Sequence, residues 1–269
     1  MAMSSLPLSV QLIWACSTLA QLMVLVLLFM KGNSRKVPFF TAYIALNICQ
    51  AGFLLVLYSI SGISSAHTVA IAWVSECITL LAQALAATEI LGITLRPYPG
   101  IWGLGWRAIA VTSALVVIVV ALTSHGQNVQ ERLFELNRGY HLTFATAFIA
   151  CLLLVRYYSI RVPAAYKMIL GGFCFNSCVE VLIYTFIQIL FHEGFEVHQP
   201  TWQFLTTLSF VAALFIWMVA LRKPFPAEDR QIASLSDSEY QRLSPEINEH
   251  LRVLNEKLLR LWKMEARQH

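Results

Sequence analysis

The sequence predicts an all-α integral membrane protein, built as a bundle of seven transmembrane helices followed by a cytoplasmic amphipathic helix. Of its 269 residues, 58% are hydrophobic, more than the roughly 50% typical of a soluble domain. Seven apolar runs are long enough, as helices, to cross about 30 Å of hydrocarbon. Basic residues are concentrated on alternate connections between these runs, which is typical of a multi-pass membrane protein.

The apolar runs follow one another along the first 221 residues with short polar connections. The first run has no basic segment before it and is too long for the core of a signal peptide, so we expect it to remain as a spanning helix. The third run contains six alanines and no Lys, Arg, Asp or Pro, a composition that lets other helices pack closely around it. The expected spans are residues 8–30, 38–61, 69–95, 107–123, 140–156, 165–191 and 201–221.

The distribution of basic residues predicts the orientation of the bundle. Seventeen of the 19 Lys and Arg residues lie in the connections 31–36, 96–107 and 156–167 or in the tail from residue 222. Only Arg132 and Arg138 lie on the opposite side. Because cytoplasmic connections carry the excess of basic residues, we expect the amino terminus outside and the carboxyl terminus in the cytoplasm of a bacterial inner membrane or a plasma membrane.

An internal repeat is indicated by two pairs of matching segments. The pattern [KR]-x-x-S-x-[KR]-V-P occurs at residues 31–38 and again at 156–163. Leu-Arg-Pro-Tyr-Pro after the third run, at 95–99, resembles Leu-Arg-Lys-Pro-Phe-Pro after the seventh, at 221–226. We interpret this as a 3+1+3 parallel pseudo-repeat, which specifies topology rather than activity. The alternative is that basic residues and proline recur at any cytoplasmic helix end.

Three glutamates lie within the expected spans: Glu76 and Glu89 in the third and Glu180 in the sixth. An ionisable side chain at membrane depth costs about 3 kcal/mol on insertion scales unless it faces protein or water. No Lys or Arg lies well inside a span to neutralise these groups. An ionised glutamate there therefore needs a cation, water or a bound solute. Glu89 lies nearer the cytoplasmic end, where we expect it to reach the interface or to pair with Arg96.

Helical spacing predicts a polar cluster between the second, third and sixth helices. Gln83 lies seven residues after Glu76 and faces the same way, and Asn176, Glu180 and Tyr184 form a stripe with a spacing of four. The alternative is a set of protonated carboxyls that serve only helix packing. The candidate ligand- or ion-binding residues are Glu76, Gln83, Glu180, Asn176, Asn47 and Tyr184.

The sequence contains no residue pattern typical of a metal site, a retinal pigment or a hydrolase. Five histidines are assigned to outer loops or helix ends, without the spacing of a zinc site: His67, His125, His141, His192 and His198. The six cysteines lie in apolar runs, so we predict no metal site and no disulfide framework. The seventh span contains no Lys for a retinal Schiff base, so we expect no retinal and no other cofactor. Hydrolase motifs are absent, and we predict neither an enzyme nor a nucleic-acid partner.

The carboxyl-terminal tail divides into a connector, residues 224–243, and a helix, residues 244–269. Ser244 is a suitable N-cap before Pro245 at the first helical position. Apolar residues then recur at intervals of three and four, which favours self-association, packing against the bundle or binding to an anionic membrane surface. A homo-oligomer or a cytoplasmic protein partner would bind through residues 245–267. The candidate partner-binding residues are Leu251, Leu254, Leu258, Leu261 and Trp262.

Two functions remain open at this point. The first is a receptor-like or accessory membrane protein that couples the intramembrane polar cluster to a cytoplasmic partner through the carboxyl-terminal helix. The alternative is a transporter of a small solute or cation, with a glutamate-lined site between helices two, three and six. The parallel repeat and the unneutralised glutamates favour the transporter, whereas the absence of proline from the helix interiors disfavours it.

Overall fold

The computed structural model describes five continuous ranges of the chain, which contain six α-helices and no β-strand. The ranges are residues 8–61, 66–95, 129–157, 162–190 and 199–225, together with positions 102–103, 106–107, 110–111, 114, 118, 249, 252–257 and 260. The helices are α1 (Leu8–Met30), α2 (Pro38–Ser61), α3 (Ala66–Leu95), α5 (Val129–Tyr157), α6 (Ala164–Leu190) and α7 (Gln199–Ala220). A short 3-10 helix, η2 (Asn33–Arg35), joins α1 to α2.

Five of these helices are long and apolar enough to cross a membrane. Their apolar stretches are Leu12–Met30, Pro38–Ile60, Val74–Leu95, Glu135–Arg156 and Ala164–Ile187, and α7 contains a shorter one, Phe204–Ala220. The prediction of long apolar helices is therefore confirmed for these five. Most of the expected fourth span, 107–123, lies outside the described residues, so the count of seven stays a prediction.

The fifth helix extends beyond the expected span of 140–156. α5 begins at Val129 rather than at residue 140. Charged residues such as Glu131 and Arg138 interrupt the apolar pattern before residue 140, but they are compatible with a helix. Hydropathy therefore located where the helix becomes apolar, not where it begins.

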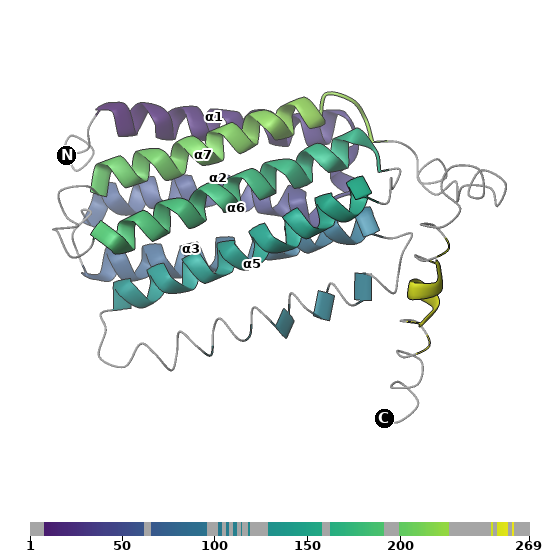
Figure 1. Cartoon of the computed structure of the whole chain (residues 1–269). Coiled ribbons are helices and arrows are strands. Elements are labelled where there is room, and N and C mark those ends of the chain that lie inside the picture. The colour runs from purple at the N-terminus through teal and green to yellow at the C-terminus, as the bar shows by residue number, and fades with distance from the viewer. Residues whose placement is uncertain are drawn as a thin grey trace.

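The six helices lie side by side in two layers (Figure 1). α1, α2 and α3 form one layer, and α7, α6 and α5 form the other, with α1 against α7 and α3 against α5 and α6. Successive helices of each layer are antiparallel, so α1, α3, α5 and α7 all begin at one end, the Leu8 end. They finish at the opposite end, which we call the Phe225 end.

This arrangement has the form that a parallel three-helix repeat would produce. A half-turn about an axis along the bundle would exchange α1 with α5, α2 with α6 and α3 with α7. Parts of three of the four matching sequence segments, at 96–99, 158–161 and 226, lie outside the described residues. The duplication itself therefore stays a prediction.

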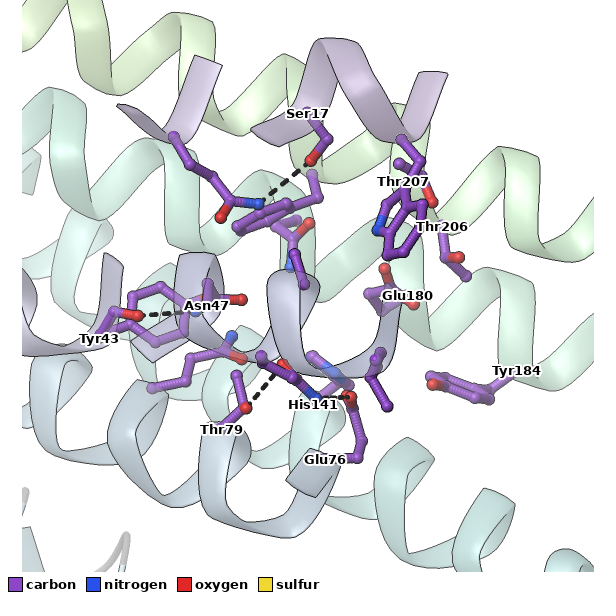
Figure 2. A pocket seen from close by; sticks show the side chains of 18 residues that line it. Ser17, Tyr43, Asn47, Glu76, Thr79, His141, Glu180, Tyr184, Thr206 and Thr207 are labelled. Atoms are coloured by element: carbon purple, nitrogen blue, oxygen red, sulfur yellow. Dashed lines mark hydrogen bonds between the residues drawn. The ribbon is translucent and has the colours of Figure 1, made fainter. Parts of the chain in front are cut away.

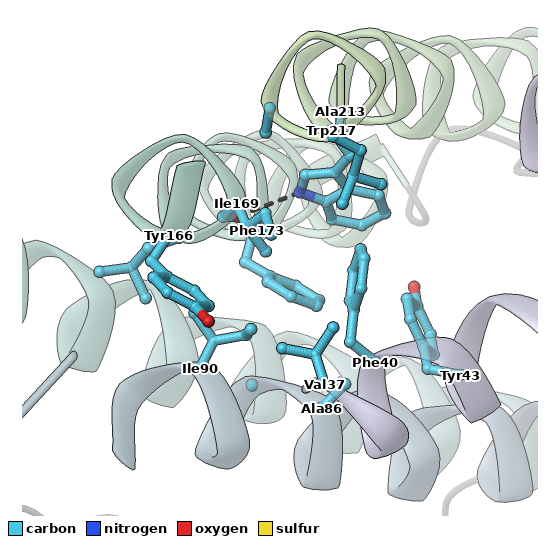
Figure 3. Close-up of a cluster of buried hydrophobic side chains, with 14 of the residues drawn as sticks. Val37, Phe40, Tyr43, Ala86, Ile90, Tyr166, Ile169, Phe173, Ala213 and Trp217 are labelled. Carbon is cyan, nitrogen blue, oxygen red and sulfur yellow. Dashed lines mark hydrogen bonds between the residues drawn. The ribbon is translucent and has the colours of Figure 1, made fainter. Parts of the chain in front are cut away.

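Aromatic side chains pack against one another in the hydrophobic core, together with aliphatic residues such as Ile90 and Ile169 (Figure 3). The indole of Trp217 is fully buried, and its ring centroid lies 4.8 Å from that of Phe173, 5.2 Å from that of Phe40 and 6.3 Å from that of Tyr43. Its Nε1 donates a hydrogen bond to the backbone oxygen of Ile169 at 3.0 Å. We call Phe40, Tyr43, Phe148, Phe173 and Trp217 the aromatic core; each is at most 3% exposed.

The chain segment that leaves α7 is held at the Phe225 end by the turn between α1 and α2. Asn33 is fully buried: its Oδ1 accepts from the amide of Phe225 at 2.8 Å, and its Nδ2 donates to the carbonyl of Lys223 at 3.4 Å. Lys36 Nζ donates to the carbonyl of Phe225 at 2.7 Å. The Phe225 ring packs on Tyr166 of α6, with ring centroids 4.7 Å apart. The exit towards the tail is thus tied to the turn between α1 and α2 and to α6.

Glu89 has a partner that sequence reasoning missed. Its carboxylate accepts from the backbone amides of Phe40 at 2.9 Å and Phe39 at 3.3 Å, in the first turn of α2. The first amides of a helix have no intrahelical acceptor, so a carboxylate there acts as a cap and also complements the helix dipole. Arg96, the expected partner of Glu89, lies outside the described residues. Glu89 thus has a structural role between α2 and α3.

Candidate functional site

A polar cavity of about 280 Å³ lies between the helices of the two layers (Figure 2). Each of the six described α-helices contributes to its lining. The lining residues are Trp14, Ser17, Gln21, Tyr43, Asn47, Gln50, Ala51, Leu54, Glu76, Thr79, Gln83, His141, Asn176, Glu180, Tyr184, Thr206, Thr207 and Phe210. In α1 and α7 these positions begin in the half nearer the Leu8 end and reach the middle of each helix, at Gln21 and Phe210. We call this cavity the polar pocket.

The structure brings together all six residues that the sequence predicted as a polar cluster. Asn47 comes from α2, Glu76 and Gln83 from α3, and Asn176, Glu180 and Tyr184 from α6. Glu76 and Glu180 can share a site only if α3 and α6 touch, and these two helices are in contact. The role of these residues in binding a ligand or ion stays a prediction.

Glu76 belongs to a hydrogen-bond network between α2 and α3. Gln50 Nε2 donates to Glu76 Oε2 at 3.2 Å and lies 3.2 Å from the Ser75 hydroxyl oxygen. The Thr79 hydroxyl donates to Gln50 Oε1 at 2.8 Å. The Gln50 amide is therefore fully engaged and holds the Glu76 carboxyl at the wall of the pocket.

Glu180 is buried, and its partner comes from α7. The Ser209 hydroxyl lies 3.2 Å from both Glu180 Oε1 and Asn176 Oδ1, and 2.9 Å from the carbonyl of Thr206. A hydroxyl has one proton, so these three acceptors share a single donor. Glu180 accordingly retains most of its capacity to accept hydrogen bonds.

His141 was assigned wrongly to an outer loop or helix end. It lies inside α5, is 5% exposed and lines the pocket. The buried face of α5 continues from the apolar positions Phe148 and Phe144 back to His141 and Asn137 at intervals of four, three and four. This periodicity could have located His141, but the imidazole interrupts the apolar run on which the span was based.

Sequence reasoning also missed the residues that α1 and α7 contribute. Trp14, Ser17 and Gln21 lie on one face of α1, at intervals of three and four. Thr206, Thr207 and Phe210 come from α7. Serine, threonine and a single glutamine are common in membrane helices. Only the packing of α1 against α7 therefore shows that these faces line the pocket.

The charge of the lining is unbalanced. The described lining residues include two carboxyls and one imidazole, but no Lys or Arg. Within the ranges that the structure describes, no three His, Cys, Asp or Glu side chains are grouped so that they could hold a metal ion. The neutral partners Gln50 and Ser209 are the donors that reach Glu76 and Glu180 there.

The predicted partner-binding residues are mostly not described. Leu254 is 47% exposed and lies in a helical segment, 252–257. Leu251, Leu258, Leu261 and Trp262 lie outside the described residues, as does the connector 226–243. The contribution of the tail to partner binding therefore stays a prediction.

No protein-family model, curated protein or solved structure matched the chain in the three comparisons made with it. The class of protein accordingly rests on the fold and the pocket alone. They define an all-helical bundle with helices long and apolar enough to span a membrane, enclosing a polar pocket with two carboxyl groups.

Proposed function

We propose that the chain is a receptor-like, multi-pass membrane protein in which a small polar or cationic solute binds in the polar pocket. Binding is passed to a cytoplasmic partner through the carboxyl-terminal helix, residues 245–267. The observation that carries the proposal is a pocket with two carboxyls, Glu76 and Glu180, and no Lys or Arg among its described lining residues. The pocket adjoins an aromatic core that contains Trp217 of α7, the helix that leads to the tail. Unneutralised carboxyls inside a membrane helix bundle indicate a functional site.

The proposed topology has seven spans in a 3+1+3 parallel repeat, with the Leu8 end outside and the Phe225 end in the cytoplasm. In this orientation the two carboxyl-bearing positions of the pocket, Glu76 and Glu180, are nearer the outer than the cytoplasmic ends of their helices. On the cytoplasmic side, Gln83 of α3 and Asn176 of α6 are each about 18 Å from their helix ends, at 1.5 Å per residue. The aromatic core lies in that interval. Its position between the pocket and the cytoplasm favours a solute that binds in the pocket without crossing the bundle.

A chain of contacts leads from the pocket to the tail. Tyr43 lines the pocket and packs against Trp217 of α7. Trp217 lies in the last turn of α7, and its carbonyl accepts from the amide of Leu221 at 2.9 Å. The next residues lead to Phe225, which Asn33 and Lys36 hold. A solute that displaces Tyr43 would therefore bias the position of the α7 exit, provided that the two arrangements differ in affinity for the solute.

A transporter of a small solute or cation is the second candidate. The position of the pocket between two three-helix layers favours it, because transporters built from repeats bind their substrates at the repeat interface. The same pocket residues, Glu76 and Glu180, would then hold the solute while the layers rock against each other. The two functions differ in whether solute crosses the bilayer.

Reconstitution of the full chain into proteoliposomes tests the proposal. We expect no uptake from a panel of radiolabelled amines, amino acids and sugars, and retention of a cytoplasmic partner only when residues 245–267 are present. Glu180→Leu should impair solute-dependent partner binding more than Glu89→Gln, because Glu89 lies outside the pocket. Uptake that Glu180→Gln abolishes and Glu89→Gln leaves intact would instead establish the transporter.

A further inference from the structure

We propose that the solute held in the polar pocket is a small primary ammonium cation, bound between the carboxyl groups of Glu76 and Glu180. The inference rests on the proposed solute-binding function of the pocket and assigns the chemical class of that solute.

The first argument is the unused acceptor capacity of the two carboxyls. In the described part of the chain, Gln50 Nε2 reaches Glu76 and the Ser209 hydroxyl reaches Glu180, each at 3.2 Å. A carboxylate has about four lone-pair sites. Both groups can therefore accept further hydrogen bonds from a solute, and an ammonium group brings three N–H donors together with a positive charge.

The second argument is a buried acceptor without a partner. Gln21 is 5% exposed, and its Nε2 donates to the Ser17 hydroxyl at 3.3 Å, but its Oε1 has no hydrogen-bond partner within the described residues. Leaving a buried acceptor unpaired costs about 1–3 kcal/mol. Because Gln21 lines the pocket, a donor on the solute can satisfy this oxygen.

The third argument excludes an anionic solute. An anionic solute would meet two carboxyls and, among the described lining residues, no Lys or Arg. The neutral amides of Gln83 and Asn176 can orient a polar substituent, but they do not offset that repulsion. The rings of Trp14, Tyr184 and Phe210 also line the cavity, and aromatic faces attract cations.

The size of the cavity limits the solute. Its volume is about 280 Å³, the share of liquid volume taken by roughly nine water molecules at about 30 Å³ each. That is just below the range of about 300–1,000 Å³ that is usual for ligand pockets. The solute is therefore a small amine rather than a lipid or a drug-sized molecule.

The test uses probes that share one butyl chain and differ in the polar group. Butylammonium and 1,4-butanediammonium are the predicted ligand class; butyltrimethylammonium lacks N–H donors, 1-butanol lacks charge and butyrate has the opposite charge. The full chain in nanodiscs is titrated with each probe, and the shift of its unfolding temperature gives the affinity. We expect a saturable upward shift with at least one of the two primary ammonium probes. The other three should bind at least about tenfold more weakly.

Matched variants locate the bound cation. Glu76→Gln and Glu180→Gln keep the side-chain shape and remove the charge, and each should weaken ammonium binding by about 10-fold to 100-fold. Glu89→Gln is the control, because the Glu89 carboxyl caps α2 outside the pocket. It should leave the affinity for the ammonium probes unchanged. Comparing the unfolding temperatures of the unliganded variants shows that each one has folded.

The possible results separate this inference from the proposed function. The ammonium assignment is wrong if neither primary ammonium probe shifts the unfolding temperature, if butyltrimethylammonium, 1-butanol or butyrate binds equally well, or if both pocket variants bind like the Glu89 variant. A neutral polyol that binds in a Glu180-dependent manner would overturn the assignment and leave the solute-binding pocket intact. Ammonium binding without any effect on tail partners would uphold the assignment and refute the coupling.

Discussion

Replacing Gly172 by alanine should force the Trp217 indole out of its place between α6 and α7. A Cβ built on Gly172 would meet the indole Nε1 and lie 2.8 Å from Cδ1 and 3.1 Å from Cε2. The indole cannot move away freely, since it is fully buried and packs against Phe40 and Phe173. Moving it also breaks the 3.0 Å hydrogen bond to the carbonyl of Ile169.

The expected cost follows from three contributions. Inserting a methyl group into a packed core costs about 1–3 kcal/mol, and losing the hydrogen bond of Trp217 costs about 1 kcal/mol. Alanine is favoured over glycine inside a helix by about 1 kcal/mol, which offsets the second contribution. Gly172→Ala should therefore lower the free energy of unfolding by about 1–3 kcal/mol.

Gly171 supplies the matched control, because a Cβ there meets no atom within 4 Å. Gly171→Ala should leave stability unchanged or raise it by up to about 1 kcal/mol. Both variants are compared by thermal unfolding in one detergent, with the folded fraction measured by size-exclusion chromatography. Trp217→Phe should remove most of the cost of Gly172→Ala, as a double-mutant cycle measures. Equal stability of the Gly171 and Gly172 variants would refute the packing that we assign to the indole.

Three further predictions concern the ends of the bundle and the tail. Glu89→Leu removes the carboxylate that caps α2, so it should lower stability by about 0.5–2 kcal/mol in thermal unfolding, whereas an unchanged midpoint would contradict the capping role. Asn33→Leu leaves the buried amide of Phe225 without an acceptor, so it should lower the free energy of unfolding by about 1–3 kcal/mol and speed proteolysis after α7. A digestion rate like that of the native chain would contradict the role of Asn33 in holding this segment. Leu254→Asp combined with Leu261→Asp should abolish self-association or partner binding without unfolding the bundle, and an oligomer that persists on native gels would show that the tail does not mediate it.

The helices could be predicted from the sequence with good accuracy where the chain is apolar. α1 (Leu8–Met30) and α2 (Pro38–Ser61) begin and end at the predicted residues. The start of α5 could not be found in this way, because residues 129–139 are helical but not apolar. Hydropathy reports the transfer of side chains into hydrocarbon, whereas a helix begins wherever its backbone hydrogen bonds begin.

The pocket could be predicted only in part, for a related reason. Glu76 and Glu180 were found because an ionisable group in a span is costly, and helical spacing then identified their neighbours. Gln21 and His141 carry no comparable signal, since either could face another helix or a membrane interface. Their place in the pocket depends on how α1 and α5 are rotated and which helices they contact.

The amino-acid sequence alone determined that this chain forms long apolar helices and that two carboxyls within the spans need polar surroundings, because both follow from local composition and 3.6-residue periodicity. The tertiary structure decided which faces meet: it brought α3 and α6 together, added α1, α5 and α7 to the lining, and packed aromatic rings against one another in the core. In a membrane, apolar side chains gain little by leaving lipid for protein, so helix partners are selected by shape and hydrogen bonding between whole surfaces. Those surfaces combine residues far apart in the chain, and a single stretch of sequence does not contain them.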